Sequence, residues 1–594
     1  MKLRQIALRT ASGICFLVLT HHQHSAKSMA APPIAADSHE QPTDMRHWIE
    51  QFTADRNDLN YKYRSELDSE RFTRFQSEYA GWLAAMDQVD FDPMSIENQV
   101  DYLLLRNHIR HELQLLQADE KRDSEAIRLI PFWTEIIDFI RTRDQMKKAE
   151  GADAATTLHN VSTQSDSLKK AIENGEYKEF DPIVALRAAE RINHLRERMA
   201  ETHRFYDGYD PVYSWWCKEP FANADQSLTQ LAKIVRSSVA GIPENDKDRI
   251  VGLPIGEQAL LDELAFEHIP YSPSELVRIA EREFAWCDTE MEKAATEMGF
   301  DDWRDAQEKV KTLHVDPGDQ PEMIRELAWE AIQFLQQNDL VTVPPLAADT
   351  WRMDMMSPER QRLNPFFLGG PSIIVSFPTD SMTHPEKLMS MRGNNIHFAR
   401  ATVHHELIPG HRLQYFMKER YRPYRKVFST PFWIEGWALY WEMRLYDMDF
   451  AKSAEDRVGM LFWRKHRCAR IIFSLNYQLG RWSPEQCIEF LISRVGHEPA
   501  NAAAEVRRSV MGGYGPLYQA AYMLGGLQIR ELRQQLVGTG KMTDRQFHDA
   551  VLQQNSIPIE LLRAQLTRQP LTKDFRTIWR FAGEPQATEQ PAAK

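Results

Sequence analysis

Helical periodicity is the feature that most restricts the fold of this chain. The segment 272–299 shows it most clearly, because apolar residues recur there at helical spacing before a terminating glycine. Ser272 suits the N-cap, Pro273 the first helical position, and Glu275 the reciprocal contact of a capping box. Comparable patterns lie at 100–116, 456–475 and 483–496. We therefore expect a mostly α fold.

One segment favours a strand instead. Residues 369–378, GGPSIIVSFP, form a β-branched run bounded by Gly-Gly and Pro. The run ends about 26 residues before a histidine-rich segment that begins at His404. We therefore expect a small β element beside that segment.

The N-terminus is typical of a signal peptide. Residues 1–30 combine basic residues, a short apolar stretch and small residues near the expected cleavage position. We therefore expect a periplasmic or secreted protein. No other stretch is apolar enough to span a membrane. The net charge of −13 argues against a surface for nucleic acid or for an anionic membrane.

The rest of the chain reads as one large unit. We predict a linker at 31–45, a single helical domain at 46–583 and a disordered polar tail at 584–594. Within the domain, an N-terminal half at about 46–270 and a catalytic half at about 271–583 are expected to face each other across a cleft.

The segment 404–416, HHELIPGHRLQYF, raises the question of a metal site. His405 and His411 are six residues apart, so a straight helix would separate them by about 9 Å and rotate them by roughly 240°. Two zinc ligands must lie much closer, because each sits about 2.0–2.1 Å from the ion. His404 and His411 share a helix face but lie about 10.5 Å apart along the axis. An unbroken helix therefore excludes a shared metal.

The same segment contains residues that break a helix. Pro409 has no N–H group and its ring clashes with the carbonyl four residues earlier. Gly410 permits backbone angles that other residues avoid. A bulge of about two residues at 408–410 would return His411 towards His405. The alternative is a kink required only for packing, and a lone His-Glu pair is more often a surface feature.

Nearby carboxylates could complete such a site. Glu406 follows the first histidine of the pair and suits a general base that takes a proton from the attacking water. A third ligand could come from PFWIEGWALYWEMRLY at 431–446. Glu435 is the better candidate, because it lies in the apolar first turns of an expected helix, and Glu442 is the reserve. The tryptophans of that helix are expected to be core residues.

Two segments resemble a known family. HHELIPGHRLQ resembles the HExxPGHHxQ motif of the bacterial domain of unknown function 885 family, which belongs to the broad zinc-peptidase group. FWIEGWALYWE resembles the EGWAxYxE segment of that family, and the similarity covers about 271–532. The resemblance implies a large, helical, two-lobed metallopeptidase-like fold of the gluzincin type, with a deep cleft and a small β element beside the site.

The resemblance also implies roles for individual residues. It implies one Zn²⁺ per chain, held by His405, His411 and Glu435, with Glu406 as general base. Tyr522 matches a tyrosine that could donate a hydrogen bond to the oxyanion, and its alternative is a buried helix tyrosine. Ile374 and Ser376 in the expected strand are further substrate-binding candidates, because the strand would align a peptide by β-addition. Tyr518, and Arg508 in AAAEVRR, are also substrate-binding candidates.

The chain departs from the family pattern at Arg412, Ser474 and Gln478, and also in the segment 513–522, GYGPLYQAAY, which stands in place of the family's PGQAxSY with three extra residues after Glu505. These departures spare the expected metal ligands but put specificity and activity in question. We therefore expect a zinc peptidase that acts on peptides. The alternatives are a catalytically silent zinc-containing peptide-binding protein and a zinc hydrolase of a non-peptide amide. The sequence leaves open the cleavage position, the oligomeric state and the choice of metal beyond a preference for zinc.

Overall fold

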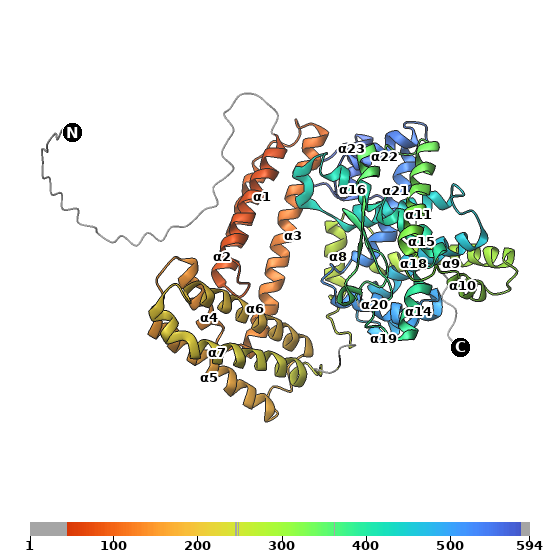
Figure 1. Cartoon of the computed structure of the whole chain (residues 1–594). Helices are drawn as coiled ribbons and strands as arrows, with labels where there is room; N and C mark the ends of the chain where they lie inside the picture. The colour runs from red at the N-terminus through yellow and green to blue at the C-terminus, as the bar shows by residue number, and fades with distance from the viewer. Residues whose placement is uncertain (1–43, 244–245, 247–248, 362, 584–594) are drawn as a thin grey trace, which may run out of the picture.

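The computed structural model describes residues 44–583, apart from 244–245, 247–248 and 362. The expected leader, nearly all of the expected linker and the expected tail lie outside these residues. The described chain is mostly helical, with one small sheet (Figure 1). The prediction of a mostly α fold with a small β element is confirmed.

The N-terminal part consists of an arm and a bundle (Figure 1). The arm consists of α1 (Met45–Lys62), α2 (Ser69–Asp87) and α3 (Ile96–Ala126). The bundle consists of α4 (Trp133–Asp144), α5 (Gly151–Glu173), α6 (Pro182–Tyr206) and α7 (Pro211–Ile234). The arm shares one apolar core with the C-terminal part of the chain, whereas the bundle has a core of its own.

The C-terminal part contains the remaining helices and both strands. Its first helices are α8 (Gly256–Phe266), α9 (Pro273–Glu297), α10 (Trp303–Lys311), α11 (Gln320–Gln337), α12 (Pro345–Asp349), α13 (Pro358–Gln361) and α14 (His384–Gly393). The following helices are α15 (Ile396–Glu406), α16 (His411–Lys418), α17 (Pro431–Tyr446), α18 (Ala454–Gln478), α19 (Pro484–Phe490), α20 (Pro499–Met511), α21 (Tyr518–Leu536), α22 (Asp544–Leu552) and α23 (Ile559–Thr567). Helix α9 begins with the predicted capping box, in which Ser272 and Glu275 make reciprocal contacts.

Helix α18 is the centre of this part. Its side chains are buried along almost the whole length, and it packs against α9, α15 and α21. A helix that is buried on all sides has no solvent face for its charged residues. The arginines of α18 therefore need partners inside the protein.

The sheet has two parallel strands, β1 (Arg352–Met355) and β2 (Ser372–Val375). Ile373 and Val375 of β2 are buried and pack with apolar residues of α11 and α15. This small core fixes the sheet against the helix that carries the histidines.

Helices α17 and α21 cross at unusually short range. A Cβ atom on Gly436 would lie 2.5 Å from the backbone of Gly525, and one on Gly525 would lie 2.1 Å from the carbonyl oxygen of Phe432. Neither helix therefore tolerates a side chain at the crossing. The glycines bring the face of α17 that carries Glu435 next to the first turns of α21.

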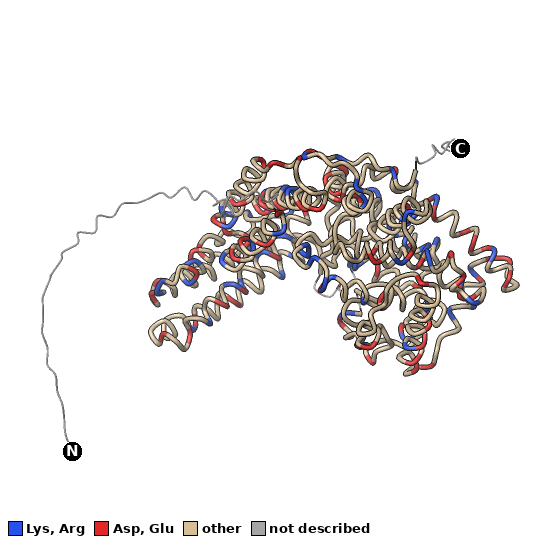
Figure 2. Tube along the Cα trace, turned by 90° about the horizontal axis from the view of Figure 1, so that it is seen from above, with Lys and Arg blue, Asp and Glu red and all other residues tan. Residues whose placement is uncertain are grey.

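Charge is spread over the molecule. Figure 2 shows basic and acidic residues interspersed along the helices rather than separated by sign. Within the described residues, no helix combines the length and apolar character needed to cross a membrane.

Candidate metal centre

The predicted helix break is a turn between two helices. Helix α15 ends at Glu406 and α16 begins at His411. The residues between them, 407–410, form a turn, so the expected two-residue bulge within one helix is wrong in detail. The indole N–H of Trp437 donates to the carbonyl oxygen of Pro409 at 2.8 Å. The turn is therefore anchored to α17, and α16 can take a direction of its own.

Gly410 allows this turn to close tightly. Its N–H group donates to the carbonyl oxygen of His404 at 3.0 Å. A Cβ atom at this position would lie 1.7 Å from the carbonyl oxygen of His405. Only a residue without a Cβ atom fits so close to the preceding helix end, which is why glycine is required here.

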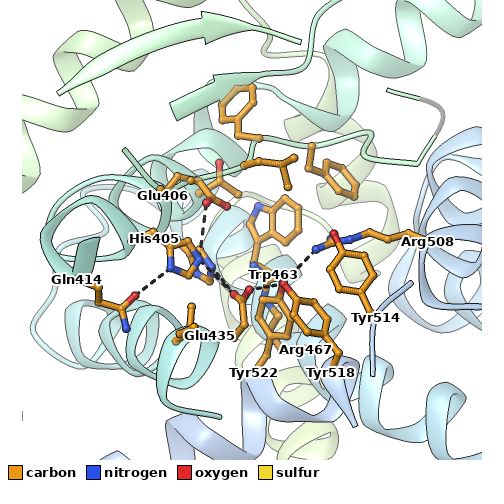
Figure 3. Close-up of a pocket in the computed structure, with 18 of the residues that line it drawn as sticks. His405, Glu406, Gln414, Glu435, Trp463, Arg467, Arg508, Tyr514, Tyr518 and Tyr522 are labelled. Carbon is orange, nitrogen blue, oxygen red and sulfur yellow. Dashed lines mark hydrogen bonds and ion pairs between the residues drawn. The ribbon is translucent and has the colours of Figure 1, made fainter. Parts of the chain in front are cut away.

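The turn brings the two predicted histidines together with the predicted glutamate, and Figure 3 shows His405 beside Glu435. The Oε2 atom of Glu435 lies 3.5 Å from Nε2 of His405 and 3.2 Å from Nε2 of His411. The two imidazole rings are almost perpendicular, with centroids 4.8 Å apart. One carboxylate oxygen therefore faces two imidazole nitrogens in a buried position.

The Nδ1 atom of each imidazole ring has a hydrogen-bond partner on the side away from Glu435. Nδ1 of His405 lies 2.6 Å from Oε1 of Glu442, which also pairs with Arg467 at 3.3 Å. Nδ1 of His411 lies 3.0 Å from Oε1 of Gln414. An ionised carboxylate only accepts, so Nδ1 of His405 donates to Glu442. Glu442, the reserve ligand, thus contacts the outer nitrogen.

The facing charges of His411 and Glu435 shift the pKa values of both groups. Burial lowers the pKa of His411, but the facing Glu435 carboxylate outweighs burial and raises this pKa to about 9. Burial likewise raises the pKa of Glu435, while His411 and His405 hold it well below its usual range. His411 and Glu435 therefore form an ion pair at neutral pH. A cation that binds here must displace the proton of His411.

Glu406 lies at the edge of the same centre. Its Oε2 atom is 3.8 Å from Nε2 of His411, and burial raises the pKa of its carboxyl group. A Cβ atom on Gly369 would lie 2.7 Å from the backbone oxygen of Glu406. Glycine at that position lets the loop before β2 pass directly over Glu406.

A cavity of about 290 Å³ opens onto the centre. Tyr518 and Tyr522 of α21 both line it, but their hydroxyl groups have different partners. The Tyr518 hydroxyl donates to Oε1 of Glu435 at 2.5 Å. The Tyr522 hydroxyl accepts from Arg508 at 3.4 Å, and its ring is stacked on His405 at 6.1 Å between centroids. The hydrogen of the Tyr522 hydroxyl is thus directed to neither of these partners.

The expected strand contacts require a correction. Ile374 exchanges backbone hydrogen bonds with Leu368, at 2.7 and 3.0 Å, so its backbone is already paired. Ser376 is buried, donates to Gln361 at 2.9 Å and lines a different pocket. The loop 366–370 lines the cavity instead. The sequence pattern located the strand but could not show which neighbouring segment would cover its edge.

The single-residue departures from the family pattern lie away from the cavity, whereas the departing segment 513–522 contributes Tyr514, Tyr518 and Tyr522 to its lining. Arg412 donates to the hydroxyl of Thr350 at 2.7 Å. Gln478 accepts from the backbone of Ile255 at 3.2 Å, and Ser474 is buried in α18. None of the three single-residue departures lines the cavity.

Several cavity residues were not singled out from the sequence. Gln414 could have been found, because it follows His411 by three residues and so lies on the same helix face. Arg467, Arg470 and Tyr514 come from distant segments, and no sequence spacing connects them to the histidines. Only the packing of α18 and the loop before α21 brings them to the cavity.

The chain resembles bacterial proteins of unknown function. Residues 54–566 match the family described as "Bacterial protein of unknown function (DUF885)". A solved putative lipoprotein of unknown function from Shewanella oneidensis has a TM-score of 0.66 at 16% identity, over 88% of this chain and 100% of that one. A putative lipoprotein from Colwellia psychrerythraea has a TM-score of 0.55 at 16% identity, over 88% of this chain and 99% of that one. No curated protein matches the sequence. The chain belongs to the DUF885 family of bacterial proteins.

Proposed function

We propose that this protein is a zinc-dependent hydrolase of peptides. The carrying observation is the single Glu435 oxygen that lies 3.2 and 3.5 Å from the two imidazole Nε2 atoms. Ligands about 2.0–2.1 Å from a tetrahedral zinc ion are separated from one another by roughly 3.3 Å. Both Glu435 distances are close to this separation, so His405, His411 and Glu435 are the residues that would hold the ion, with a fourth position left for substrate or water.

The outer contacts support metal binding, and the number of ligands favours a catalytic over a structural metal. A carboxylate or amide oxygen on Nδ1 of each histidine fixes the ring and increases its basicity, as is usual for zinc ligands. Glu442 and Gln414 take these positions. Three protein ligands are typical of catalytic zinc, whereas structural sites use four.

The remaining residues have separate chemical tasks. When bound, zinc lowers the pKa of water and polarises a carbonyl group. Glu406 accepts the proton of the attacking water and passes it to the leaving amine as the C–N bond breaks and a carboxylate forms. Burial raises the pKa of Glu406 towards neutral pH, which suits both accepting the proton from water and donating it to the amine. The Tyr522 hydroxyl donates to the developing oxyanion.

The size of the cavity supports small substrates. About 290 Å³ is at the lower end for a ligand site, so a short peptide fits and a folded protein does not. We include the two-lobed, deep-cleft architecture in this proposal, because the α4–α7 bundle has a separate apolar core. We also infer export from the cytoplasm, supported by the two similar structures described as lipoproteins.

A combined metal and substrate assay tests the proposal. The purified chain should contain or bind one zinc ion, and digestion of a mixed peptide library should give new fragments by mass spectrometry. Glu406→Gln should keep zinc and lose hydrolysis, because an amide cannot accept the proton. Stoichiometric zinc without cleavage of any peptide would favour a silent peptide-binding protein, and cleavage of non-peptide amides alone would favour the other alternative. Absence of zinc binding would refute the proposal.

A further inference from the structure

One wall of the cavity has more positive than negative side chains. Arg467 and Arg470 of α18 and Arg508 of α20 all line the cavity. Arg467 pairs with Glu442 at 3.3 Å, and Arg470 pairs with Glu505 at 2.7 Å. Within the described residues, the carboxylate nearest to Arg508 is again Glu505, at 3.9 Å. Three guanidinium groups therefore share two carboxylates.

Arg508 is the member of this wall that lacks a close carboxylate. Its exposed fraction is 7%, and its Nε atom has no hydrogen-bond partner among the described residues. Its guanidinium group lies 4.9 Å from the ring centre of Tyr514 and 5.7 Å from that of Tyr518. Figure 3 shows this side chain extending into the pocket towards Tyr522. A buried charge whose only nearby carboxylate is 3.9 Å away and already paired with Arg470 is poorly compensated, so an anion is expected here when the site is in use.

The other acidic residues of the cavity do not supply that anion. Glu435 faces the two histidines, and Glu406 lies beside them. A divalent cation at the metal centre would balance the charges of these two carboxylates. The surplus charge of Arg508 would then remain for the substrate.

We propose that Arg508 binds the C-terminal carboxylate of the peptide substrate, which makes the protein a carboxypeptidase. This inference rests on the proposed zinc-dependent peptide hydrolysis. A guanidinium group matches a carboxylate in shape and can give it two parallel hydrogen bonds. Each unmodified peptide offers one such group at its end, and the small cavity favours a chain end over a continuing chain.

The position of Arg508 also sets the size of the released fragment. The Tyr522 hydroxyl contacts Arg508, and the Tyr522 ring is stacked on His405. One tyrosine side chain thus connects the anion site to the metal centre. The connection is about as long as one tyrosine side chain, and an extended chain spans about 3.3–3.6 Å per residue, so we expect a released fragment of one or two residues.

Paired peptide libraries test this assignment. Octapeptides with a free C-terminal carboxylate and the same peptides with a C-terminal amide are digested by the zinc-loaded protein. The free acids should be hydrolysed at least about tenfold faster, since a charge-assisted hydrogen bond is lost in the amides. Mass spectrometry should detect release of one or two C-terminal residues. Equal rates for acids and amides would overturn the inference, as would a preference that follows acidic side chains instead of the chain end.

Variants assign the preference to one residue. Arg508→Met should bring the acid-to-amide ratio close to one while zinc content is unchanged, and Arg508→Lys should keep an intermediate ratio. Arg507→Met is the matched control, because Arg507 is adjacent in sequence but lines a different pocket. It should keep the full ratio. If Lys418→Met, at another position of the same cavity, abolishes the ratio and Arg508→Met does not, the assignment is wrong.

A binding measurement separates this inference from the proposed function. Zinc-loaded Glu406→Gln protein is titrated with the acid and amide libraries by calorimetry. If the wild-type chain hydrolyses neither library, the hydrolase proposal fails. If the Glu406→Gln protein binds the acids more tightly than the amides, and adding Arg508→Met removes this difference, the anion site is still supported. Equal binding of the two libraries, or no binding of either, would overturn it.

Discussion

Replacing Gly410 with alanine is expected to disrupt the metal centre without changing a single donor group. The added Cβ atom would lie 1.7 Å from the carbonyl oxygen of His405, and real Cβ atoms essentially never come closer than 3.0 Å. The turn must therefore shift by more than about 1 Å, several times the ~0.2 Å tolerance of a metal–ligand distance. Zinc affinity should fall at least about a hundredfold, the upper end of the effect of losing an outer hydrogen bond. The strain should also cost about 1–3 kcal/mol of folding stability.

Competition titration with a chromophoric chelator measures the zinc affinity of the variant, and thermal melts with and without zinc measure the stability that the metal adds. Gly515→Ala is the matched control. A Cβ atom at Gly515 would meet no atom within 4 Å, so this variant should behave as the wild type. Wild-type zinc affinity in Gly410→Ala would refute the argument, because His411 could then not depend on the tight turn for its position.

The remaining predictions address the two tyrosines and one buried acid. Tyr522→Phe should lower kcat by about a hundredfold to a thousandfold at unchanged zinc affinity. Tyr518→Phe should instead lower the zinc affinity by about tenfold to a hundredfold, because Tyr518 contacts the expected ligand Glu435. If kinetics and zinc titration show the reverse pattern, the roles of the two tyrosines are exchanged. Burial raises the pKa of Glu267 to about 8, although its contact with Thr430 opposes this. Its contribution to stability is therefore fully present below about pH 4.5 and is lost as the pH rises through about 8. Denaturant unfolding should show Glu267→Gln gaining stability relative to the wild type between pH 5 and pH 9, by up to about 4 kcal/mol, and a pH-independent difference would contradict this pKa.

Local signals in the sequence were sufficient to predict much of the fold. The serine, proline and glutamate before α9 predicted its first turn, because capping depends only on neighbouring residues. The strand at 369–378 was located but is shorter than expected, with β2 at Ser372–Val375. Its partner β1, Arg352–Met355, was not predicted, because its alternation of polar and apolar residues covers only four positions and the strand is largely exposed.

The candidate site was predictable where spacing alone restricts geometry. His405 and His411 are six positions apart, which required a broken helix if the two were to meet, and Pro409 and Gly410 indicated where. The sequence did not show that the break separates two helices, because the turn depends on its contact with Trp437 of α17. The anion site at Arg508 was equally hidden, since its surplus charge follows from how α18 and α20 pack together.

X-ray diffraction from zinc-soaked crystals, with data collected on both sides of the zinc absorption edge, tests the central claim most directly. We expect one anomalous peak per chain, about 2.0–2.1 Å from Nε2 of His405, Nε2 of His411 and Oε2 of Glu435. Glu442 should remain on Nδ1 of His405 and outside the coordination sphere. A peak elsewhere in the chain, or one coordinated by Glu442 in place of Glu435, would contradict the proposed site.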